Sequence, residues 1–440
     1  MVGKLSCKIL CYCEEAEVTT HWRTLFGLGK SATKILIPSQ KLCPPRQSLV
    51  VMVIALMQNA KFLLAVFTLS QANTTSADVY YVGNKGNQTN NGAPLEPFPS
   101  VEFALSKVGG GNTIIVHTGL YSNPIIVERQ FSGTAERPTI IKSSSKWKAA
   151  FYGAPYHDIN VRAEYVVIDG FELAGARYSG IKVEGDHCVV TNCWIHNNAI
   201  MGIEMHNRRD SVISANLIEF NGSHIHLHHG IYASGEGFTV HGNVVRHNAG
   251  FGIHMYPSVK MSEVSCNLIY GHAYKAGIIL DCPVGGGNNR VINNTIVDNH
   301  CAITIWQGYG ETIANNILAG QPQAVVLDSF TSNVVMESNL FVSGKHPIGD
   351  KNIVGDPKFV DSDHGNYNLA LGSPAIGAGH AGYAPRFDFW GCPITNTAAL
   401  DIGGFAGDDA PFRRGSSAKK PVWLYRATPQ ETSNCDYWVK

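Results

Sequence analysis

The chain has 440 residues, of which 44% are hydrophobic and 15% are charged. Its 34 basic and 34 acidic residues balance to a formal charge of zero, which excludes the basic footprint that nucleic-acid binding requires. The composition is neither that of a disordered chain nor that of a membrane protein.

The first part of the chain differs from the rest. Residues 1–56 show no repeat and carry four of the eleven cysteines, so we predict a non-native or disordered leader. Residues 57–77 have the order of a secretory signal peptide, with Lys61 as the charged residue, an apolar core over 62–69 and a small-residue cleavage site ending at Ala77. A membrane anchor is the alternative, but polar residues interrupt the run of about 20 apolar residues that a span needs. We therefore expect a secreted or periplasmic protein without stable membrane association.

Residues 78–121 predict the start of a repetitive domain. A strand over 79–82 is followed by a polar loop, a helix from Ser100 and a strand over 113–116. One face of the helix is apolar, through Val101, Ala104, Leu105 and Val108. We predict that this short helix covers the open apolar end of the repeats that follow, as terminal repeats must.

A phrase with a period of 22 to 27 residues recurs between Val166 and Val342. In each unit an Asn or Asp has an apolar residue three positions before it and another two positions after it. These anchors are Asp169, Asn192, Asn216, Asn243, Asn267, Asn294, Asn316 and Asn339. No unit of this length can bury its apolar side chains alone, so the units must stack. Three apolar phrases per unit predict an all-β fold, a parallel β-helix with three strands per coil, about ten coils and a column of Asn side chains. Leucine-rich repeats share the period, but their L-x-x-L-x-L phrase is missing.

Segments on both sides of the repeats are similar to those of a known superfamily. YYV at Tyr80, the Gly/Asn loop, the Pro-Phe pair and GNTIIV at Gly111 resemble the N-terminal start of the pectate-lyase-like, right-handed parallel β-helix superfamily. GDPKFVD at Gly355, DFWG at Asp388 and DIGGF at Asp401 resemble its closing segment. The resemblance implies a right-handed β-helix and export from the cell.

This resemblance also sets the predicted domain boundaries. It covers residues 78–407, with the regular repeats over 166–342 and the closing segment over 355–407, and it leaves 408–440 as a C-terminal tail. It does not identify a substrate, because the fold hosts lyases, hydrolases, epimerases and non-enzymatic proteins.

A second phrase, Gly-Ile followed by alternating residues, predicts which side chains reach the surface. Alternate residues of a strand face opposite ways, so the third and fifth residues of each phrase point outward. The first outward column is predicted to be Lys182, Glu204, Tyr232, His254, Ile279, Thr304 and Val326, and the second Glu184, His206, Ser234, Tyr256, Asp281, Trp306 and Asp328. Ionisable and aromatic residues crowd the earlier coils, which indicates a site in a long groove. The alternative is the ordinary polar face of a solenoid.

Such a groove suits an extended acidic polysaccharide, and the resemblance favours uronic-acid polymers. β-Elimination needs a cation for the C6 carboxylate, a base for the C5 proton and an acid for the leaving oxygen. Lysine or arginine, histidine and tyrosine side chains supply these three functions. The predicted catalytic residues are His206, His254, Tyr232, Tyr256, Lys182 and Glu204, and the predicted substrate-binding residues are Arg208, Arg209, Trp306, Asp281 and His229.

One stretch narrows the choice of base. The run from Met205 loosely resembles the alginate C5-epimerase branch, which has a catalytic His before one repeat and a His-Gly-Ile strand one coil later. The resemblance assigns these positions to His206 and to His229 with the two residues after it. The chain departs from the branch after Ser234, where Gly235 stands in place of a basic residue.

We predict no metal site. His224, His226 and His228 alternate in a loop, but no carboxylate or Cys accompanies them at ligand spacing, which favours solvated histidines. Ca²⁺ is the one cofactor that the resemblance leaves open, with Glu184, Glu204 and Asp281 as available oxygen ligands.

Three functions therefore remain open for a protein that we expect to be a monomer. The first is a lyase or epimerase that abstracts the C5 proton of a uronate. The second is a glycoside hydrolase, with Glu184 and Glu204 as its paired carboxyl groups. The third is a non-catalytic β-helix, either a glycan-binding protein or a periplasmic accessory protein.

Overall fold

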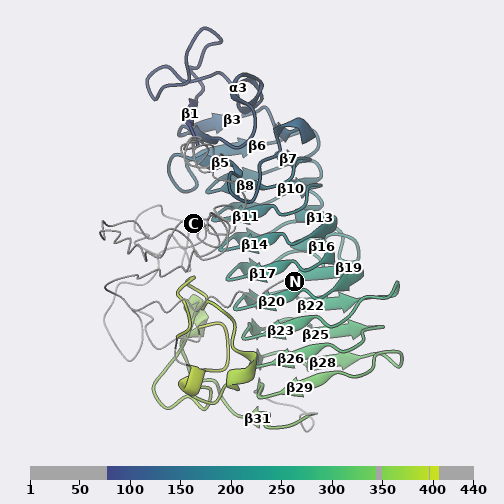
Figure 1. Ribbon diagram of the computed structural model, residues 1–440. Coiled ribbons are helices and arrows are strands. Elements are labelled where there is room, and N and C mark those ends of the chain that lie inside the picture. The colour runs from purple at the N-terminus through teal and green to yellow at the C-terminus, as the bar shows by residue number, and fades with distance from the viewer. Residues whose placement is uncertain (1–76, 343–348, 396, 406–440) are drawn as a thin grey trace, which may run out of the picture. The chain divides into compact units, whose positions relative to one another are not determined.

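The computed structural model describes residues 77–342, 349–395 and 397–405. The predicted leader, residues 57–76 of the predicted signal peptide and the predicted tail lie outside these ranges. Within them the chain forms stacked coils, each built from three strands (Figure 1). No helix in the described ranges has both the length and the hydropathy of a membrane-spanning segment.

Three parallel sheets run along the stack, and the first two have eleven and nine strands. The first sheet consists of β1 (Val79–Val82), β2 (Thr113–Val116), β5 (Thr139–Ser143), β8 (Val166–Asp169), β11 (Val189–Thr191), β14 (Val212–Ser214), β17 (Thr239–His241), β20 (Glu263–Ser265), β23 (Arg290–Ile292), β26 (Thr312–Ala314) and β29 (Val335–Glu337). The second consists of β4 (Ile125–Val127), β7 (Ile159–Val161), β10 (Ser179–Val183), β13 (Met201–Arg209), β16 (Ile231–Glu236), β19 (Ile253–Lys260), β22 (Ala276–Asp281), β25 (Cys301–Trp306) and β28 (Gln323–Leu327).

The third sheet also has eleven strands and completes each coil. It consists of β3 (Gly119–Tyr121), β6 (Ala149–Tyr152), β9 (Glu172–Ala174), β12 (Trp194–His196), β15 (Leu217–Glu219), β18 (Val244–Arg246), β21 (Leu268–Tyr270), β24 (Thr295–Val297), β27 (Ile317–Ala319), β30 (Leu340–Phe341) and β31 (Ile353–Val354). The predicted parallel β-helix of about ten coils is therefore confirmed.

The pairing register between neighbouring coils stacks equivalent apolar side chains in the interior. In the second sheet, isoleucines pair with isoleucines from coil to coil, and all of them are fully buried: Ile181, Ile203, Ile231, Ile253, Ile278 and Ile303. β-Branched side chains suit the pleated surface of a strand, and each such burial contributes about 1.5–3 kcal/mol. A one-residue slip would turn this column to solvent, so the core fixes the register.

The predicted Asn column is present from Asn216 to Asn339. The carboxamide Nδ2 of each Asn donates to the Oδ1 of the next at 2.9–3.0 Å. The prediction that Asn192 and Asp169 belong to the same column was wrong. Val190 pairs with Ile213, which places Cys193 beside Asn216, and Asn192 instead donates to Asp169.

A second ladder, which the sequence analysis missed, stacks at another corner of the coils. Asn198, Asn221 and Asn248 bond in series, and His272 then takes the place of an Asn before Asn299. Burial lowers the pKa of His272 to about 4, so the ring is neutral. A neutral imidazole has one donor and one acceptor nitrogen, so it can replace a carboxamide in the ladder.

The predicted N-terminal capping helix is also present. It is α3 (Val101–Val108), and its N-cap Ser100 accepts a hydrogen bond from the amide of Phe103. Val101 and Leu105 are buried in the same core as the first coils. Gly109, with φ +74°, ends the helix in a conformation that favours glycine.

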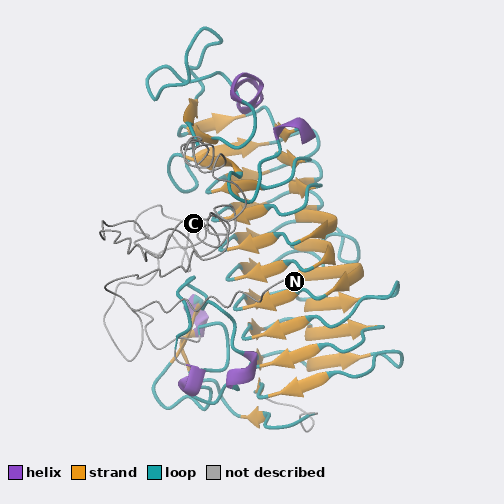
Figure 2. Ribbon diagram, in the orientation of Figure 1, coloured by secondary structure: helices purple, strands orange, loops and turns teal. Residues whose placement is uncertain are grey.

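The closing segment packs on the outside of the later coils (Figure 2). It contains the antiparallel pair β32 (Phe359–Asp361) and β33 (Asn366–Leu369) and short 3₁₀ turns: η2 (Ser362–His364), η3 (Ala381–Tyr383) and η4 (Thr397–Ala399). A further 3₁₀ turn, η1 (Arg129–Phe131), follows β4. Phe389, Ile402 and Phe405 form a second hydrophobic core with outward residues of the third sheet such as Leu268. Backbone groups of the segment also bond to the coils, as Gly404 does to Thr295.

Candidate functional site

The second sheet brings four predicted site residues together on its outer face. Lys182 pairs with Glu204, Glu204 with Tyr232, and Tyr232 with His254. Paired residues on neighbouring strands lie about 4.8 Å apart, so four side chains from four coils form one continuous row.

The predicted outward columns fail where the backbone departs from regular pleating. In β13, Met205 pairs with Ala233 and Arg208 pairs with Gly235, so His206 and Asn207 both lie opposite Ser234. This bulge lets the Asn207 amide donate to a buried Ser234 hydroxyl, which is therefore not part of an outward column. Ile279 is also buried, because a small apolar cluster that includes Phe251 covers it.

Glu204 holds His206 in a defined orientation. Its Oε1 lies 2.7 Å from Nε2 of His206, and its Oε2 accepts a hydrogen bond of 2.9 Å from Ser179 Oγ. Lys182 Nζ lies 4.0 Å from the same carboxylate. Burial by itself raises the pKa of Glu204, but the hydrogen bonds from His206 and Ser179 outweigh burial and lower the pKa to about 2. Glu204 is therefore a carboxylate at neutral pH.

Tyr232 lies between the two histidines of the row. Its ring centroid is 4.9 Å from that of His206 and 5.3 Å from that of His254. Burial, together with the nearby Tyr256 and Glu204, raises the pKa of Tyr232 to about 12, so its hydroxyl keeps its proton at neutral pH. Tyr256 is close to both Tyr232 and His254, with centroid distances of 6.3 and 5.5 Å.

A buried hydrogen-bonded chain supports His254. The Phe251 amide donates to Nδ1 of His229, so His229 carries its proton on Nε2, which lies 3.0 Å from Nδ1 of His254. Burial and the neighbouring His254 lower the pKa of His229 to about 2, which keeps it neutral. Nε2 of His254 then faces Asp281 at 3.9 Å.

Arginines lie on the side of the row that faces the N-terminal coils. Arg208 Nη1 donates to the Glu184 carbonyl and is 3.3 Å from Asp186, and Arg162 contacts Glu184 at 3.6 Å. Together with Arg129 they line a polar hollow of about 420 Å³. The amide of Arg209 bonds to Asp186, while its side chain is exposed.

The remaining predicted residue, Trp306, lies on the other side of the row. It pairs with Asp281 in register and is 43% exposed. The histidine loop before β16 is separate: Nδ1 of His228 accepts hydrogen bonds from the amides of Ser223 and His224. In the part of the chain that the structure describes, no three His, Cys, Asp or Glu side chains are arranged as a metal site.

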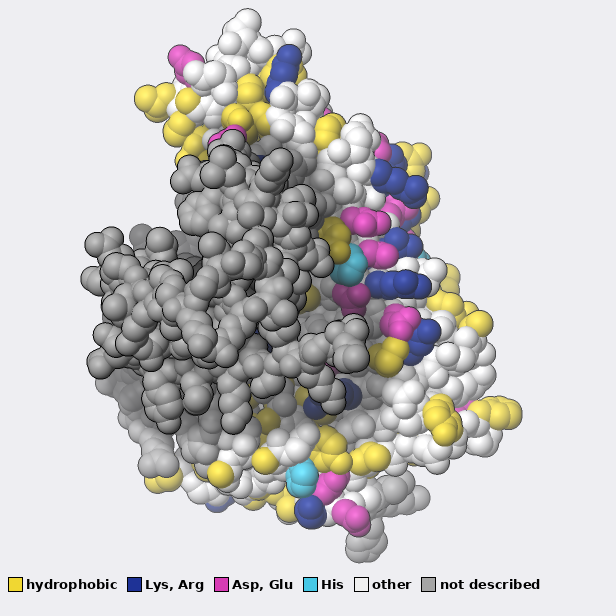
Figure 3. Space-filling view, in the orientation of Figure 1, with side chains coloured by type: hydrophobic (Ala, Val, Ile, Leu, Met, Phe, Trp, Pro, Cys, Tyr) yellow, Lys and Arg dark blue, Asp and Glu magenta, His cyan; other side chains and the backbone are white. Residues whose placement is uncertain are grey.

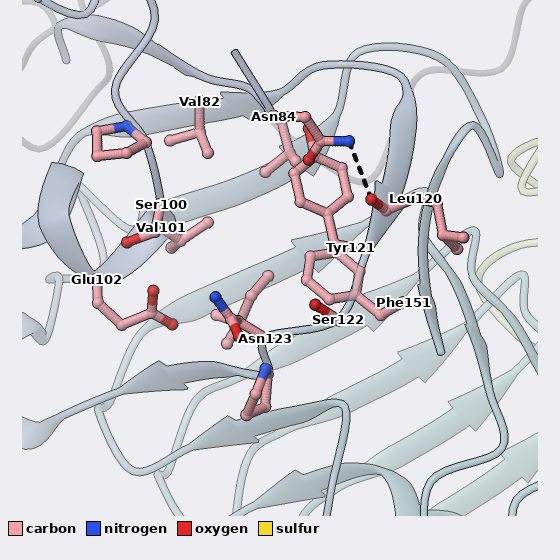
Figure 4. Close-up of a pocket in the computed structure, with 14 residues that line it drawn as sticks. Val82, Asn84, Ser100, Val101, Glu102, Leu120, Tyr121, Ser122, Asn123 and Phe151 are labelled. Carbon is pink, nitrogen blue, oxygen red and sulfur yellow. Dashed lines mark hydrogen bonds between the residues drawn. The ribbon is translucent and has the colours of Figure 1, made fainter. Parts of the chain in front are cut away.

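A different hollow lies beside α3 (Figure 4). It has a volume of about 220 Å³, and its one charged lining residue is Glu102, whose carboxylate accepts a hydrogen bond from the Ile126 amide. Asn84 also uses its amide, to bond to the Leu120 carbonyl. These polar groups are occupied in joining the cap to the first coils, so the row on the second sheet is the better candidate site.

Comparisons with known proteins agree with this architecture. Residues 80–252 match a family model described as Pel9A-like, right handed beta helix region. The crystal structure of pectate lyase Pel9A superimposes with a TM-score of 0.56 at 18% identity, over 75% of this chain and 96% of that one. The fold is therefore that of the pectate-lyase-like right-handed parallel β-helices, and residues 80–252 are similar to them in sequence as well.

The relatives found by sequence are distant. Pectate lyase L of Dickeya dadantii (strain 3937) is 27% identical over 148 residues, which are 29% of this chain and 34% of that protein. The uncharacterized protein YwoF of Bacillus subtilis (strain 168) is 24% identical over 321 residues, which are 58% of this chain and 64% of that protein. The chain thus spans about a third of the length of the pectate lyase that it matches. What the chain shares with the pectate lyases is the β-helix and a limited stretch of sequence.

The sequence analysis of this β-helix missed two residues that shape the site. Ser179 bonds to Glu204, and Phe251 positions His229. Both directly precede a Gly-Ile phrase, as His229 does. If the residue before each Gly-Ile phrase had been treated as a third column, all three residues would have been predicted to lie beside the row.

Proposed function

We propose that the protein is a polysaccharide lyase that cleaves uronic-acid polymers by β-elimination, with His206 as the base. The observation that carries the proposal is the pairing of Glu204 with His206. An ionised Glu204 accepts hydrogen bonds only, so Nε2 of His206 must carry the proton that it donates. Nδ1 is then the basic nitrogen, on a side chain that is 46% exposed.

The choice of His206 over His254 follows from access. The His254 side chain is 12% exposed, and its Nδ1 already accepts a hydrogen bond from Nε2 of His229. A base must reach the proton that it removes. We therefore assign His229 and His254 to positioning Tyr232 and Tyr256, whose rings they contact.

Tyr232 is the proposed acid. Its hydroxyl is protonated at neutral pH, and its ring lies against His206, so base and acid are next to each other. Lys182 and Arg208 flank the pair and are the proposed partners of the substrate carboxylate. A cation at that carboxylate stabilises the negative charge that develops when the C5 proton leaves.

The reaction then follows in one balanced sequence. Nδ1 of His206 takes the C5 proton, and the electron pair of that C–H bond forms a double bond between C4 and C5. The C4–O bond breaks, and Tyr232 gives its proton to the leaving oxygen. Glu204 stays ionised throughout and stabilises the imidazolium that forms on His206, as the carboxylate of a catalytic triad does.

The charge on Glu204 disfavours a glycoside hydrolase in which Glu204 is the acid. Glu184 and Glu204 both lie near Lys182 Nζ, at 3.6 and 4.0 Å. A hydrolase needs one carboxylic acid that gives its proton to the leaving group. Glu204, with a pKa of about 2, does not hold that proton at neutral pH. The signal-peptide pattern of residues 57–77 supports the further proposal that the enzyme acts outside the cell.

The test is the ultraviolet absorbance of the unsaturated product. The protein is incubated separately with pectate, alginate and chondroitin, and an increase in absorbance identifies elimination. His206→Ala should lower the rate by about 10²–10⁴-fold, and circular dichroism should show a folded variant at the assay temperature, although it loses the hydrogen bond to Glu204. His224→Ala, an exposed histidine of the neighbouring loop, is the matched control and should retain full activity. Full activity in His206→Ala would remove His206 from the mechanism.

A further inference from the structure

The loops that follow the strands of the second sheet change character along the stack. Arg129 begins the turn η1 after β4, Arg162 directly follows β7, and Arg208 lies in the last part of β13. The stretches after β22, β25 and β28, which are 282–289, 307–311 and 328–334, contain no Lys or Arg. In Figure 3, dark-blue side chains lie along the right edge of the upper coils, and yellow and white ones take their place along the lower coils.

Exposed aromatic side chains lie in or next to these stretches without Lys or Arg. Trp306, Tyr309 and Phe330 are 43%, 55% and 75% exposed. Exposed apolar groups gathered at one place on a soluble protein mark a binding surface more often than single ones do.

The backbone beneath these side chains is ordered by hydrogen bonds. Oδ1 of Asp328 accepts from the Gln307 amide at 3.1 Å, from Thr331 Oγ1 at 2.6 Å and from the amide of Phe330 at 3.3 Å. One carboxylate therefore holds the loop after Trp306 and the loop that carries Phe330. Tyr309 also pairs with Ser332 in a parallel bridge, so the two loops continue the register of the sheet. The aromatic side chains are presented on a fixed support.

We propose that Trp306, Tyr309 and Phe330 form a subsite for an uncharged sugar, on the opposite side of the Tyr232–His206 pair from the arginines. The proposal rests on the proposed function and adds that the substrate changes from acidic to neutral across the cleavage point. Aromatic rings stack on the apolar faces of sugar rings. Asp281 and Asp328 give this end a negative charge, which repels a uronate and leaves a neutral sugar unaffected.

The occupant is therefore a continuation of the polymer held at the candidate site. Trp306 lies on β25, two strands beyond His254 on β19, which corresponds to about 10 Å along the stack. A chain that spans Arg208 and Trp306 passes over Tyr232 on the way. The site would favour a polymer with esterified or neutral sugars at the end that meets Trp306. The aromatic rings would not increase the affinity for a wholly acidic polymer.

Binding to two matched probes tests the proposal. The first probe is a partially methyl-esterified hexagalacturonate, and the second is the same preparation after saponification, which restores every carboxylate. Titrations use the full chain with His206→Ala, so that neither probe is consumed. Adding Trp306→Ala or Phe330→Ala should weaken binding of the esterified probe about fivefold and leave binding of the saponified probe unchanged.

Two further variants keep the outcome interpretable. Phe220→Ala removes an exposed aromatic ring that directly follows β15 of the third sheet, and it should change neither affinity. Asp328→Ala should weaken binding of the esterified probe as the ring substitutions do, while Asp328→Asn, which keeps the accepting oxygen, should bind that probe as the parent does. Equal weakening of both probes, or no weakening of either, would overturn the proposal. Because binding is measured without turnover, absence of lyase activity in the parent protein would count against the proposed function and not against this subsite.

Discussion

The charge on Glu204 gives a direct test of the electrostatics of the candidate site. Its folded-state pKa of about 2 lies below the ordinary value of 4.5, and this fall corresponds to about 3 kcal/mol of preference for the ionised form. A depressed pKa stabilises the fold above the unfolded-state pKa, and that stabilisation is lost as the pH falls toward about 2. The Glu204 side chain is 17% exposed, so solvent screens this interaction only in part. Glu204→Gln keeps the shape and removes the charge, and should lower the free energy of unfolding by up to about 3 kcal/mol at pH 7.

Urea unfolding followed by circular dichroism measures this difference at several pH values. Linkage with these two pKa values predicts that about two fifths of the difference remain at pH 3 and about a tenth near pH 2. Glu136→Gln, at an exposed turn, is the matched control and should change stability by less than about 0.5 kcal/mol at every pH. The reasoning is refuted if wild type and Glu204→Gln differ by the same amount at pH 3 as at pH 7.

Three other changes probe the fold and the groove. Asn267→Ala leaves buried partners of the ladder unpaired and should lower the free energy of urea unfolding by about 3–5 kcal/mol. Asn192→Ala, outside the ladder, should lower it by about 1 kcal/mol. Equal losses in the two variants would contradict the register described here. Tyr232→Phe should lower lyase turnover by about 10²-fold or more with an unchanged melting temperature, and an unaffected rate would exclude Tyr232 as the acid. Arg208→Ala should lower kcat/KM for an acidic polymer about tenfold at low salt and less at high salt, because the lost cation both binds the carboxylate and stabilises the charge that develops on it. A salt-independent effect would argue against a carboxylate contact.

Much of the fold could be predicted because its two signals are periodic. The apolar phrases fixed the number of strands per coil, and the Asn spacing located the ladder from Asn216 onward. The error at Asn192 arose because Val189 and Val190 are adjacent apolar residues, which admit two registers. The second core around Phe389 could not be predicted, because it joins segments more than a hundred residues apart.

The candidate site could be predicted wherever successive side chains of a strand alternate strictly between the interior and the surface. The row from Lys182 to His254 follows directly from the period of two. The bulge after Met205 breaks that period, and no local sequence signal marks it. Whether an outward residue is exposed also depends on neighbours from other coils, which is why Ile279 is covered and Trp306 is not.

The Asn ladder keeps one geometry although the coils differ in length. Consecutive rungs are joined at 3.0 Å whether they are 27 residues apart, as Asn216 and Asn243 are, or 22 residues apart, as Asn294 and Asn316 are. The additional residues are taken up between strands, outside the repeated core. Insertions and deletions in those connections can therefore accumulate without disturbing the stack, and the outer surface can diversify one coil at a time while the scaffold is inherited unchanged.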